Sequence, residues 1–169
     1  AEQIAGGVEP DPDLKLSTLL DRALRKVDER FTEQSRVRAA IQNSGFEFPA
    51  RRITVNLAPA DLPKESGRFD LPIALAILAA SGQLSGNRLK QHEYAGELAL
   101  TGELRPIRGA LAMTLASRNS CRSLVLPETS AREAALVEGA DVLAAESLAQ
   151  VCAHLAGQDV LARPRPHDQ

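Results

Sequence analysis

The segment that most constrains this fold is a helix without any charge. Residues 71–80, LPIALAILAA, are apolar throughout. Asp70 directly before them is the predicted N-cap, because a carboxylate can accept hydrogen bonds from the free N–H groups of the first turn. Pro72 lies where its missing N–H costs no hydrogen bond, and Gly82 is predicted to end the helix. A helix that is apolar on every side is buried on every side, so the sequence predicts one domain built around it.

Composition narrows the class of protein. The 169 residues fit one domain with a sizeable core, and 44% of them are hydrophobic, which argues against disorder. No apolar run approaches the roughly 18 residues of a membrane-spanning helix, and we expect no signal peptide. Cys121 and Cys152 form no CxxC pair, so we interpret them as reduced thiols in a cytoplasmic protein. Aromatic residues are 3% and the net charge is −2, which disfavours a single-strand stacking platform and a general polyanion binder.

The N-terminal part is predicted to contain two helical runs and a strand. Residues 1–13 are rich in Gly, Pro and acids, and we expect a mobile end. An amphipathic helix begins near Asp13 and carries apolar residues at helical spacing: Leu16, Leu19, Leu20, Ala23, Leu24, Val27 and Phe31. A second run begins at Thr32 and ends at Gly45, and the two runs are either separate helices or one bent helix. The inward side of the second run is Val37, Ala40 and Ile41. Residues 51–57 alternate and predict a half-buried strand.

The C-terminal part predicts alternating strands and helices. Residues 93–100 and 103–106 flank a Thr101–Gly102 turn and predict a hairpin. The remaining predicted elements are helix 110–118, strand 123–126 ended by Pro127, helix 130–138 with Ser130 and Glu133 as a capping box, strand 141–144, and helix 147–155 ended by Gly157. Residues 158–169 are polar and proline-rich and predict a linker, so the domain is expected to span residues 14–157. This order of elements predicts an α/β fold with helices packed on a sheet.

Neither a nucleotide site nor a zinc site is predicted in this chain. There is no G-x-x-x-x-G-K-[ST] pattern, and none of the four lysines follows a glycine-rich loop. His92, His154 and His167 fall in different predicted elements, without the Cys or His spacing of a zinc site. We therefore expect no cofactor and no structural metal in this domain.

The loop before the apolar helix is one candidate site, because helix N-termini bind anions. Its cationic candidates, with those that open the preceding strand, are Lys64, Arg68, Arg51 and Arg52. The acidic neighbours that offset them are Asp61, Glu65 and Asp70. The two alternatives are an anion site and a solvated loop with local ion pairs.

Charge is segregated further along the chain. Between residues 104 and 127 there is no acid but four arginines: Arg105, Arg108, Arg118 and Arg122. Between residues 128 and 150 there are five acids and one arginine: Glu128, Glu133, Glu138, Asp141, Glu146 and Arg132. Three interpretations stay open. They are complementary faces for self-association, an arginine patch for nucleic-acid phosphate to which Arg51 and Arg52 could add, and a solvated surface whose charges pair within the monomer.

Three stretches resemble one protein family. They are VRAAIQNSGFEFPARRITVNLAPADLPKESGRFDLPIALAILAASGQ (37–83), EYAGELALTGELRPIRGALA (93–112) and LVLPETSAREAALVEGADVLAAESLAQVCAHLAGQ (124–158). Together they resemble the N-terminal domain of the magnesium-chelatase-like AAA+ proteins of bacteria, the ComM (YifB) family. The resemblance implies a Lon-protease-like domain of the ribosomal protein S5 domain 2 fold class, with helices packed on a mixed sheet.

The resemblance also implies a larger motor. In the family this domain precedes an AAA+ ATPase module, and residues 158–169 are expected to lead toward it. ATP and Mg²⁺ are expected in that module and not in this domain. For the full-length protein the resemblance implies contact with its own AAA+ module, ring formation by self-association, and a role in DNA branch migration and competence. DNA is a further candidate partner for the domain itself, and no membrane is expected.

The catalytic residues of Lon-type peptidases have no counterpart here. In that family a serine lies in a P-K-D-G-P-S-A-G loop before a buried helix, and a lysine lies in a P-I-G-G-L-K segment. The matching positions of this chain hold Arg68 and Leu111. An arginine cannot be the nucleophile and a leucine cannot deprotonate one, so we expect no peptidase activity. Ser66 has Lys64 and Glu65 beside it, which form no recognised dyad with it, and a residual serine hydrolase is a remote alternative.

One departure from the family concerns the N-terminal part. Where the family has strand segments this chain predicts a helix, and the fit resumes only near Ser35. Two family strands are therefore expected to be missing or replaced, which leaves a sheet edge that invites pairing with a second chain. The favoured hypothesis is a non-catalytic domain for assembly or positioning of the motor, and the main alternative is a domain that contacts DNA.

Overall fold

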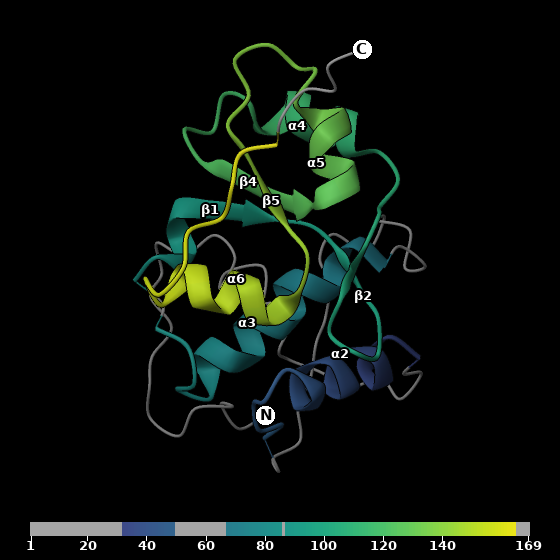
Figure 1. Cartoon of the computed structure of the whole chain (residues 1–169), viewed down its shortest axis with the longest axis vertical. Helices are drawn as coiled ribbons and strands as arrows, with labels where there is room; N and C mark the ends of the chain where they lie inside the picture. Colours follow the sequence, from purple (N-terminus) through teal and green to yellow (C-terminus); the bar gives the residue numbers. More distant parts are fainter. Residues whose placement is uncertain (1–31, 50–66, 86, 165–169) are drawn as a thin grey trace.

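The computed structural model describes residues 32–49, 67–85 and 87–164, with side chains from residue 35 onward. A parallel sheet lies at its centre, in the order β1-β4-β5. The strands are β1 (His92–Tyr94), β4 (Ser123–Pro127) and β5 (Val142–Ala145). Helices lie on both sides of this sheet (Figure 1), so the α/β class predicted from the sequence is confirmed.

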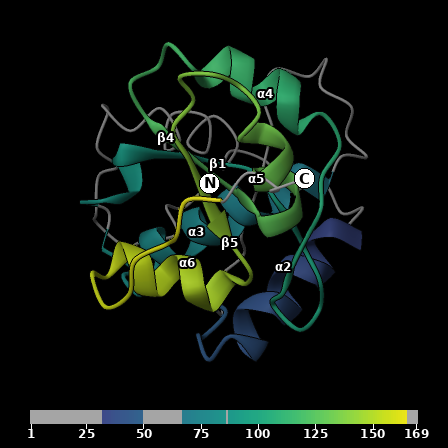
Figure 2. The ribbon, with the colours of Figure 1, turned by 45° about the horizontal axis from the view of Figure 1, so that its top comes forward.

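Each face of the sheet has its own hydrophobic core, because successive side chains of a strand point to opposite faces. Val125 of β4 joins a cluster formed with α2 (Thr32–Asn43), α3 (Asp70–Ala80) and α6 (Leu148–Leu155). Its neighbours Leu124 and Leu126 join a second cluster, formed with α4 (Ala110–Ser117) and α5 (Glu128–Ala134). The molecule therefore has three layers, with α4 and α5 together on one side of the sheet (Figures 1 and 2).

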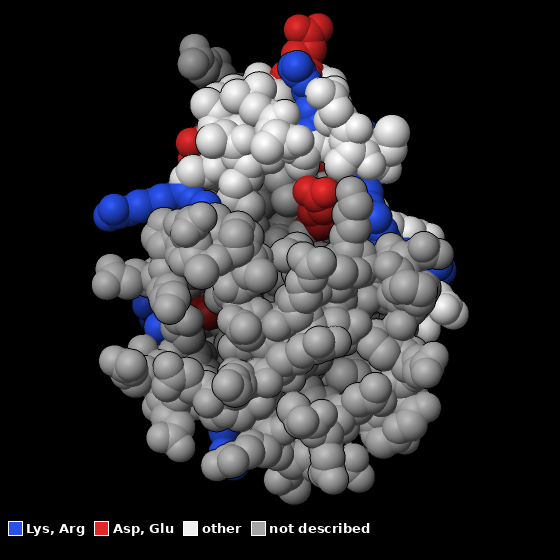
Figure 3. All heavy atoms as spheres, turned by 180° about the vertical axis from the view of Figure 1, so that it is seen from behind, with Lys and Arg blue, Asp and Glu red and all other residues white. Residues whose placement is uncertain are grey.

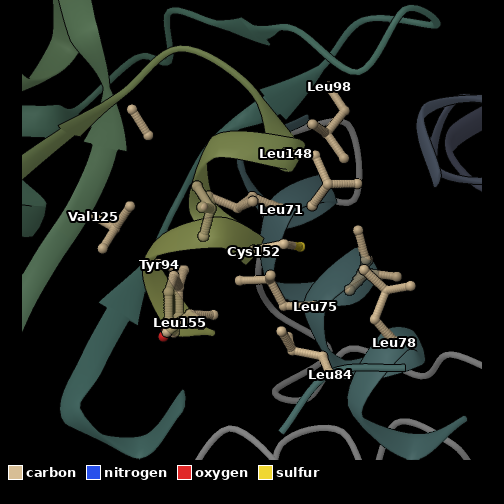
Figure 4. Close-up of a cluster of buried hydrophobic side chains, with 14 of the residues drawn as sticks. Leu71, Leu75, Leu78, Leu84, Tyr94, Leu98, Val125, Leu148, Cys152 and Leu155 are labelled. Carbon is tan, nitrogen blue, oxygen red and sulfur yellow. The ribbon is translucent and has the colours of Figure 1, made fainter. Parts of the chain in front are cut away.

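Helix α3 is the helix predicted from the apolar run, and it is buried over most of its surface. Its buried residues are Asp70, Leu71, Ile73, Ala74, Leu75, Ile77 and Leu78. Figure 4 shows Leu71 and Leu75 of α3 facing Leu148, Cys152 and Leu155 of α6 within this core. Gly82 follows the helix with a φ of +77°, a conformation that glycine adopts without strain. The predicted end of the helix is confirmed.

The predicted N-cap of α3 is wrong. Phe69 holds the N-cap position, no side chain caps the helix, and Asp70 is the first helical residue. The Asp70 carboxylate accepts a hydrogen bond from the Leu98 backbone N–H at 3.1 Å and one from Arg36 at 3.2 Å. Long-range partners in the core thus take the oxygens that a local cap would use, and short-range sequence spacing does not reveal such partners.

Helix α2 matches the second predicted helical run. Val37, Ala40 and Ile41 are at most 1% exposed and join the core beside α3. Gly45 follows the helix with a φ of +89°, as expected for a glycine at a helix end. The inward face and the end of this helix are confirmed.

The predicted hairpin is confirmed in kind, but its first strand is wrong in extent. β2 (Glu97–Leu98) and β3 (Leu104–Arg105) pair antiparallel, and Gly102 in the turn has a φ of +92°. The expected continuous strand over 93–100 is divided, because the backbone N–H groups of Ala95 and Gly96 donate to different elements, Val125 and Arg68. In the described part of the chain, β2 and β3 therefore form a sheet separate from the parallel one.

The later elements follow the predicted order. α4, β4, β5 and α6 lie within one residue of the expected bounds. Ser147 caps α6 by accepting from the Gln150 N–H at 3.1 Å. The capping box at Ser130 is wrong, because α5 begins at Glu128 and the Ser130 hydroxyl accepts from the Ile107 N–H at 3.0 Å. The short 3₁₀ turns η1 (Gly67–Phe69) and η2 (Leu89–Gln91) precede α3 and β1.

Packing continues beyond residue 157, where a linker was expected. Leu161 is 3% exposed and belongs to the core around α3 and α6. Ala162 forms an antiparallel bridge with Ala144 of β5, and this bridge adds the one antiparallel partner of the parallel sheet among the described residues. The expectations for residues 1–13, for the amphipathic helix from Asp13, for strand 51–57 and for the family's N-terminal strands lie outside the described residues.

Candidate functional site

Helix α4 exposes two leucines and buries two hydroxyl side chains, while Ala110 and Met113 of the same helix pack on the core. Thr114 is 1% exposed and donates to the Ala110 carbonyl at 2.6 Å, and Ser117 is 9% exposed and donates to the Thr114 carbonyl at 3.2 Å. Leu111 and Leu115 are 41% and 49% exposed. The hydrophobic effect favours the opposite orientation, so this helix has an unpartnered apolar face, which we call the α4 face: Leu111, Ala112, Leu115 and Ala116.

Two of the four predicted arginines flank α4, and the other two belong to other elements. Arg108 lies just before the helix and Arg118 just after it, and a helix of this length spans about 12 Å. Arg105 lies in β3 opposite Glu97, and Arg122 lies just before β4. In the described part of the molecule none of these four guanidinium groups forms an ion pair.

The acids of residues 128–150 do not pair with these arginines either. Glu128 pairs with Arg132 one helical turn away, and Asp141 pairs with Arg163. Leu136 is 74% exposed between Glu133 and Glu138, and in the ranges that the structure describes neither of these glutamates has an ion-pair partner. We call these three residues the acidic edge. Among the described residues, no ion pair joins the arginine segment (residues 104–127) to the acidic segment (residues 128–150). The interpretation that the two segments pair within the monomer is therefore not supported by these residues.

The end of the molecule that α4 and α5 form is largely uncharged when seen from behind. Figure 3 shows this pale surface at the top of the view, with charged side chains at its margins. The hydrophobic side chains of α4 contribute to the exposed apolar area of the chain. Exposed apolar patches bordered by charge mark interaction sites more often than bare surface does.

The first turn of α3 is organised around a buried carboxylate. Asp70 is 1% exposed. Its carboxylate forms an ion pair with Arg36 and also accepts a hydrogen bond from the Leu98 backbone N–H. Burial raises the pKa of Asp70 and outweighs the opposing effect of the Arg36 guanidinium. Arg68 lies over the Phe69 ring at 5.1 Å. Asp70 thus ties α2, α3 and β2 together, which is a structural role. Lys64, Ser66, Arg51 and Arg52 lie outside the described residues.

The two positions that match the Lon dyad lie in different layers. Arg68 belongs to η1, directly before α3, and Leu111 belongs to α4 on the other side of the sheet. Neither side chain is a nucleophile or a base of the kind a Ser–Lys dyad requires.

Sequence reasoning did not identify the α4 face. The helix itself was predicted, but its segment ALAMTLAS is apolar on most sides, so periodicity did not show which side faces water. One signal was available. Thr114 and Ser117 lie three residues apart and therefore share one side of the helix. With Leu111 and Leu115 on another side, this pattern is compatible with an inverted helix.

Two features of ligand-binding sites, a phosphate-binding loop and a metal-ligating cluster, are absent from the sequence and from the described residues respectively. The sequence lacks a phosphate-binding loop. Among the described residues there is no group of three or more His, Cys, Asp or Glu side chains that could hold a metal ion. Within the same residues no helix combines the length and hydrophobicity that a membrane crossing requires.

The fold and this surface define an α/β domain with an exposed apolar helix face. Its sequence matches the family described as "Subunit ChlI of Mg-chelatase" over residues 8–130, and the chain belongs to this magnesium-chelatase-related family. It is 51% identical over 135 residues to "Uncharacterized protein YifB" of Escherichia coli (strain K12), covering 80% of this chain and 27% of that protein. It is 53% identical over 128 residues to "Competence protein ComM" of Haemophilus influenzae, covering 76% of this chain and 25% of that protein.

More distant relatives extend the match. An uncharacterized protein of Mycobacterium tuberculosis (strain ATCC 25618 / H37Rv) is 38% identical over 152 residues, which is 89% of this chain and 29% of that protein. The chain thus spans about a quarter of the length of the curated relatives it matches. The sequence-based recognition of the ComM and YifB family is confirmed.

Proposed function

We propose that this chain is a non-catalytic, Lon-like domain of a magnesium-chelatase-like AAA+ ATPase, and that it acts in assembly or positioning of the motor. The observation that carries the proposal is the α4 face, where two leucines point to solvent while two hydroxyl side chains point inward. ATP hydrolysis with Mg²⁺ is assigned to the region of the relatives that this chain does not span. The positions that hold Arg68 and Leu111 support the absence of peptidase chemistry.

We further propose that a second copy of this chain covers the α4 face, and that its acidic edge makes the contact. Two α4 helices packed antiparallel would bring Arg108 of one copy beside Arg118 of the other, and these like charges repel. A head-to-tail contact instead places the bordering arginines against Glu133 and Glu138, with Leu136 against Leu111 and Leu115. Such heterologous contacts generate rings when they close and filaments when they do not.

Self-association tests this arrangement. Sedimentation velocity should show concentration-dependent association that weakens with salt, because the bordering charges are exposed and screened. Leu115→Glu should abolish the association. Val160→Glu is the matched control, since Val160 is 80% exposed and lies outside the α4 face. Arg108→Glu should weaken association, and mixing it with Glu133→Arg copies should restore contact. A monomer at every concentration, or equal effects of Leu115→Glu and Val160→Glu, would contradict the proposal.

Absence of catalysis is tested separately. The isolated chain should hydrolyse neither casein nor ATP above a buffer blank. Serine-reactive probes should leave Ser66 unlabelled. Peptide cleavage or labelling at Ser66 would replace the assembly role with the remote alternative, a residual hydrolase.

The alternative proposal is contact with DNA through the arginine segment. It is supported by the four guanidinium groups that form no ion pair among the described residues and by the name of the competence relative. Fluorescence anisotropy with forked and duplex DNA should then show binding that falls steeply with salt, because each phosphate contact releases counterions. Arg108→Glu should reduce this binding. No binding at low salt would remove the alternative and leave DNA branch migration to the region of the relatives beyond this chain.

A further inference from the structure

Two histidines from distant parts of the chain, one buried and one half-buried, share a hydrogen bond. His92 begins β1 and His154 lies in the last turn of α6, and their Nε2 atoms are 3.1 Å apart. His92 is 8% exposed. The Leu161 backbone N–H donates to Nδ1 of His154 at 3.1 Å. A relay of two hydrogen bonds therefore runs from residue 161 through α6 to the central sheet.

This relay holds the segment of residues 158–164, which we call the C-terminal strap. Leu161 inserts its side chain into the core. The next residue, Ala162, accepts a hydrogen bond from the Ala144 N–H at 2.9 Å, and Arg163 pairs with Asp141 at 3.3 Å. The last of these contacts is exposed and contributes little to stability. The N–H groups of Gln158 and Asp159 donate to the Ala153 carbonyl at 2.9 and 3.3 Å and fix the start of the strap. Its later residues are held by the buried side chain of Leu161, one bond to β5 and the histidine relay.

The relay determines which nitrogen of each ring carries a proton. A backbone N–H can only donate, so Nδ1 of His154 is unprotonated and the proton of the neutral ring is on Nε2. Nε2 of His92 must then accept, which places the proton of His92 on Nδ1. That Nδ1 is buried and has no hydrogen-bond partner among the described residues. Each ring is thus held in one neutral tautomer.

An additional proton breaks the relay at one of its two bonds. On Nδ1 of His154 the proton faces the Leu161 N–H, so the acceptor that holds the strap is lost. On Nε2 of His92 it faces the Nε2–H of His154, so the bond between the rings is lost. A metal ion on the two Nε2 atoms has the same consequence, because a metal-bound imidazole donates from its other nitrogen.

The surroundings of the pair oppose protonation near neutral pH. Burial lowers the pKa of both histidines, and a charge on His154 lowers the pKa of His92 further. The Arg88 guanidinium also lowers the pKa of His154, while Asp159 raises it and Asp141 raises that of His92. Tyr94, whose ring lies 6.0 Å from that of His92, is neutral, because burial raises the pKa of its hydroxyl.

We propose that the His92–His154 pair is an acid-sensitive latch, and that protonation of His154 on Nδ1 releases Leu161 and the residues after it from the domain. The strap carries the chain toward residue 165, so release lengthens the tether to anything attached there. This role is independent of the α4 face, which lies on the other side of the sheet.

Amide hydrogen exchange by NMR tests the latch on the intact chain. The protection factors of the Leu161 and Ala144 amides should fall by about tenfold or more between about pH 7.5 and pH 5.5, because one pKa unit corresponds to a tenfold change. The amide of Leu71 donates to the Gly96 carbonyl at 3.0 Å without any histidine, and its protection should stay constant. Unchanged protection at Leu161, or a parallel fall at Leu71, would overturn the proposal.

A histidine variant and the imidazole tautomers provide two further tests of the latch. In His154→Asn the side-chain oxygen can still accept from Leu161 but cannot titrate, so the protection of Leu161 should become independent of pH. The control His167→Asn removes a histidine outside the described residues and should behave like the wild type. Imidazole ¹⁵N spectra of the wild type at neutral pH should place the proton of His154 on Nε2, and a proton on Nδ1 would also overturn the latch.

Discussion

At the scale of single residues, Asp70 is the side chain on which most of the local structure depends. Its carboxylate accepts from the Leu98 N–H and from Arg36, and it is 1% exposed. Asp70→Ala leaves the buried Leu98 N–H without this acceptor, which we expect to lower the free energy of unfolding by about 1–3 kcal/mol. Asp70→Asn keeps an oxygen acceptor and carries no charge, so it should cost less. Urea denaturation of both variants measures the difference, and equal losses would show that the hydrogen bond to Leu98 contributes nothing.

At the scale of elements, two serines near the starts of helices differ in a way that mutation can measure. Ser147 caps α6, whereas Ser130 lies inside α5, is 1% exposed and accepts from Ile107. Ser147→Ala should lower the free energy of unfolding by about 1 kcal/mol, because it removes the cap. Ser147→Asp should keep most of the wild-type stability, because aspartate is an equally good cap. Ser130→Asp should be the more damaging aspartate variant, since it buries a charge. Thermal unfolding of these three single variants measures the differences, and tolerance of aspartate at Ser130 would contradict the assigned contact.

Those serines also show how far sequence could predict the elements. Local patterns were sufficient for the existence of α3, α4 and α6, because periodicity and end signals such as Gly82, Ser147 and Gly157 act within a few residues. They were insufficient for Ser130 and Asp70, whose hydrogen bonds reach 23 and 28 residues along the chain. The α4 face was not predicted, for a related reason. Which side of an apolar helix faces water depends on the sheet behind it.

At the scale of the whole molecule, the stability of the domain should depend on pH through the histidine relay. In the folded state the pKa values of His92 and His154 lie below 6.5, whereas the unfolded chain titrates near about 6.5. Below that pH the unfolded state binds more protons than the folded state. The free energy of unfolding is therefore constant in this respect above about pH 7 and falls as the pH decreases toward the folded-state pKa values.

Chemical denaturation at a series of pH values between about 5 and 8 measures this dependence. His154→Asn should flatten the curve, because it removes one titrating group and the charge that lowers the pKa of His92. His167→Asn should leave the slope unchanged. Asp70 acts in the opposite direction, since its raised pKa makes its contribution decline as the pH rises above about 3.8, so it should not mimic the histidine effect. If His154→Asn kept the wild-type slope between pH 5 and 7, the relay would not be the origin of the acid sensitivity. The loss of stability at low pH would then have to come from titrating groups outside the relay.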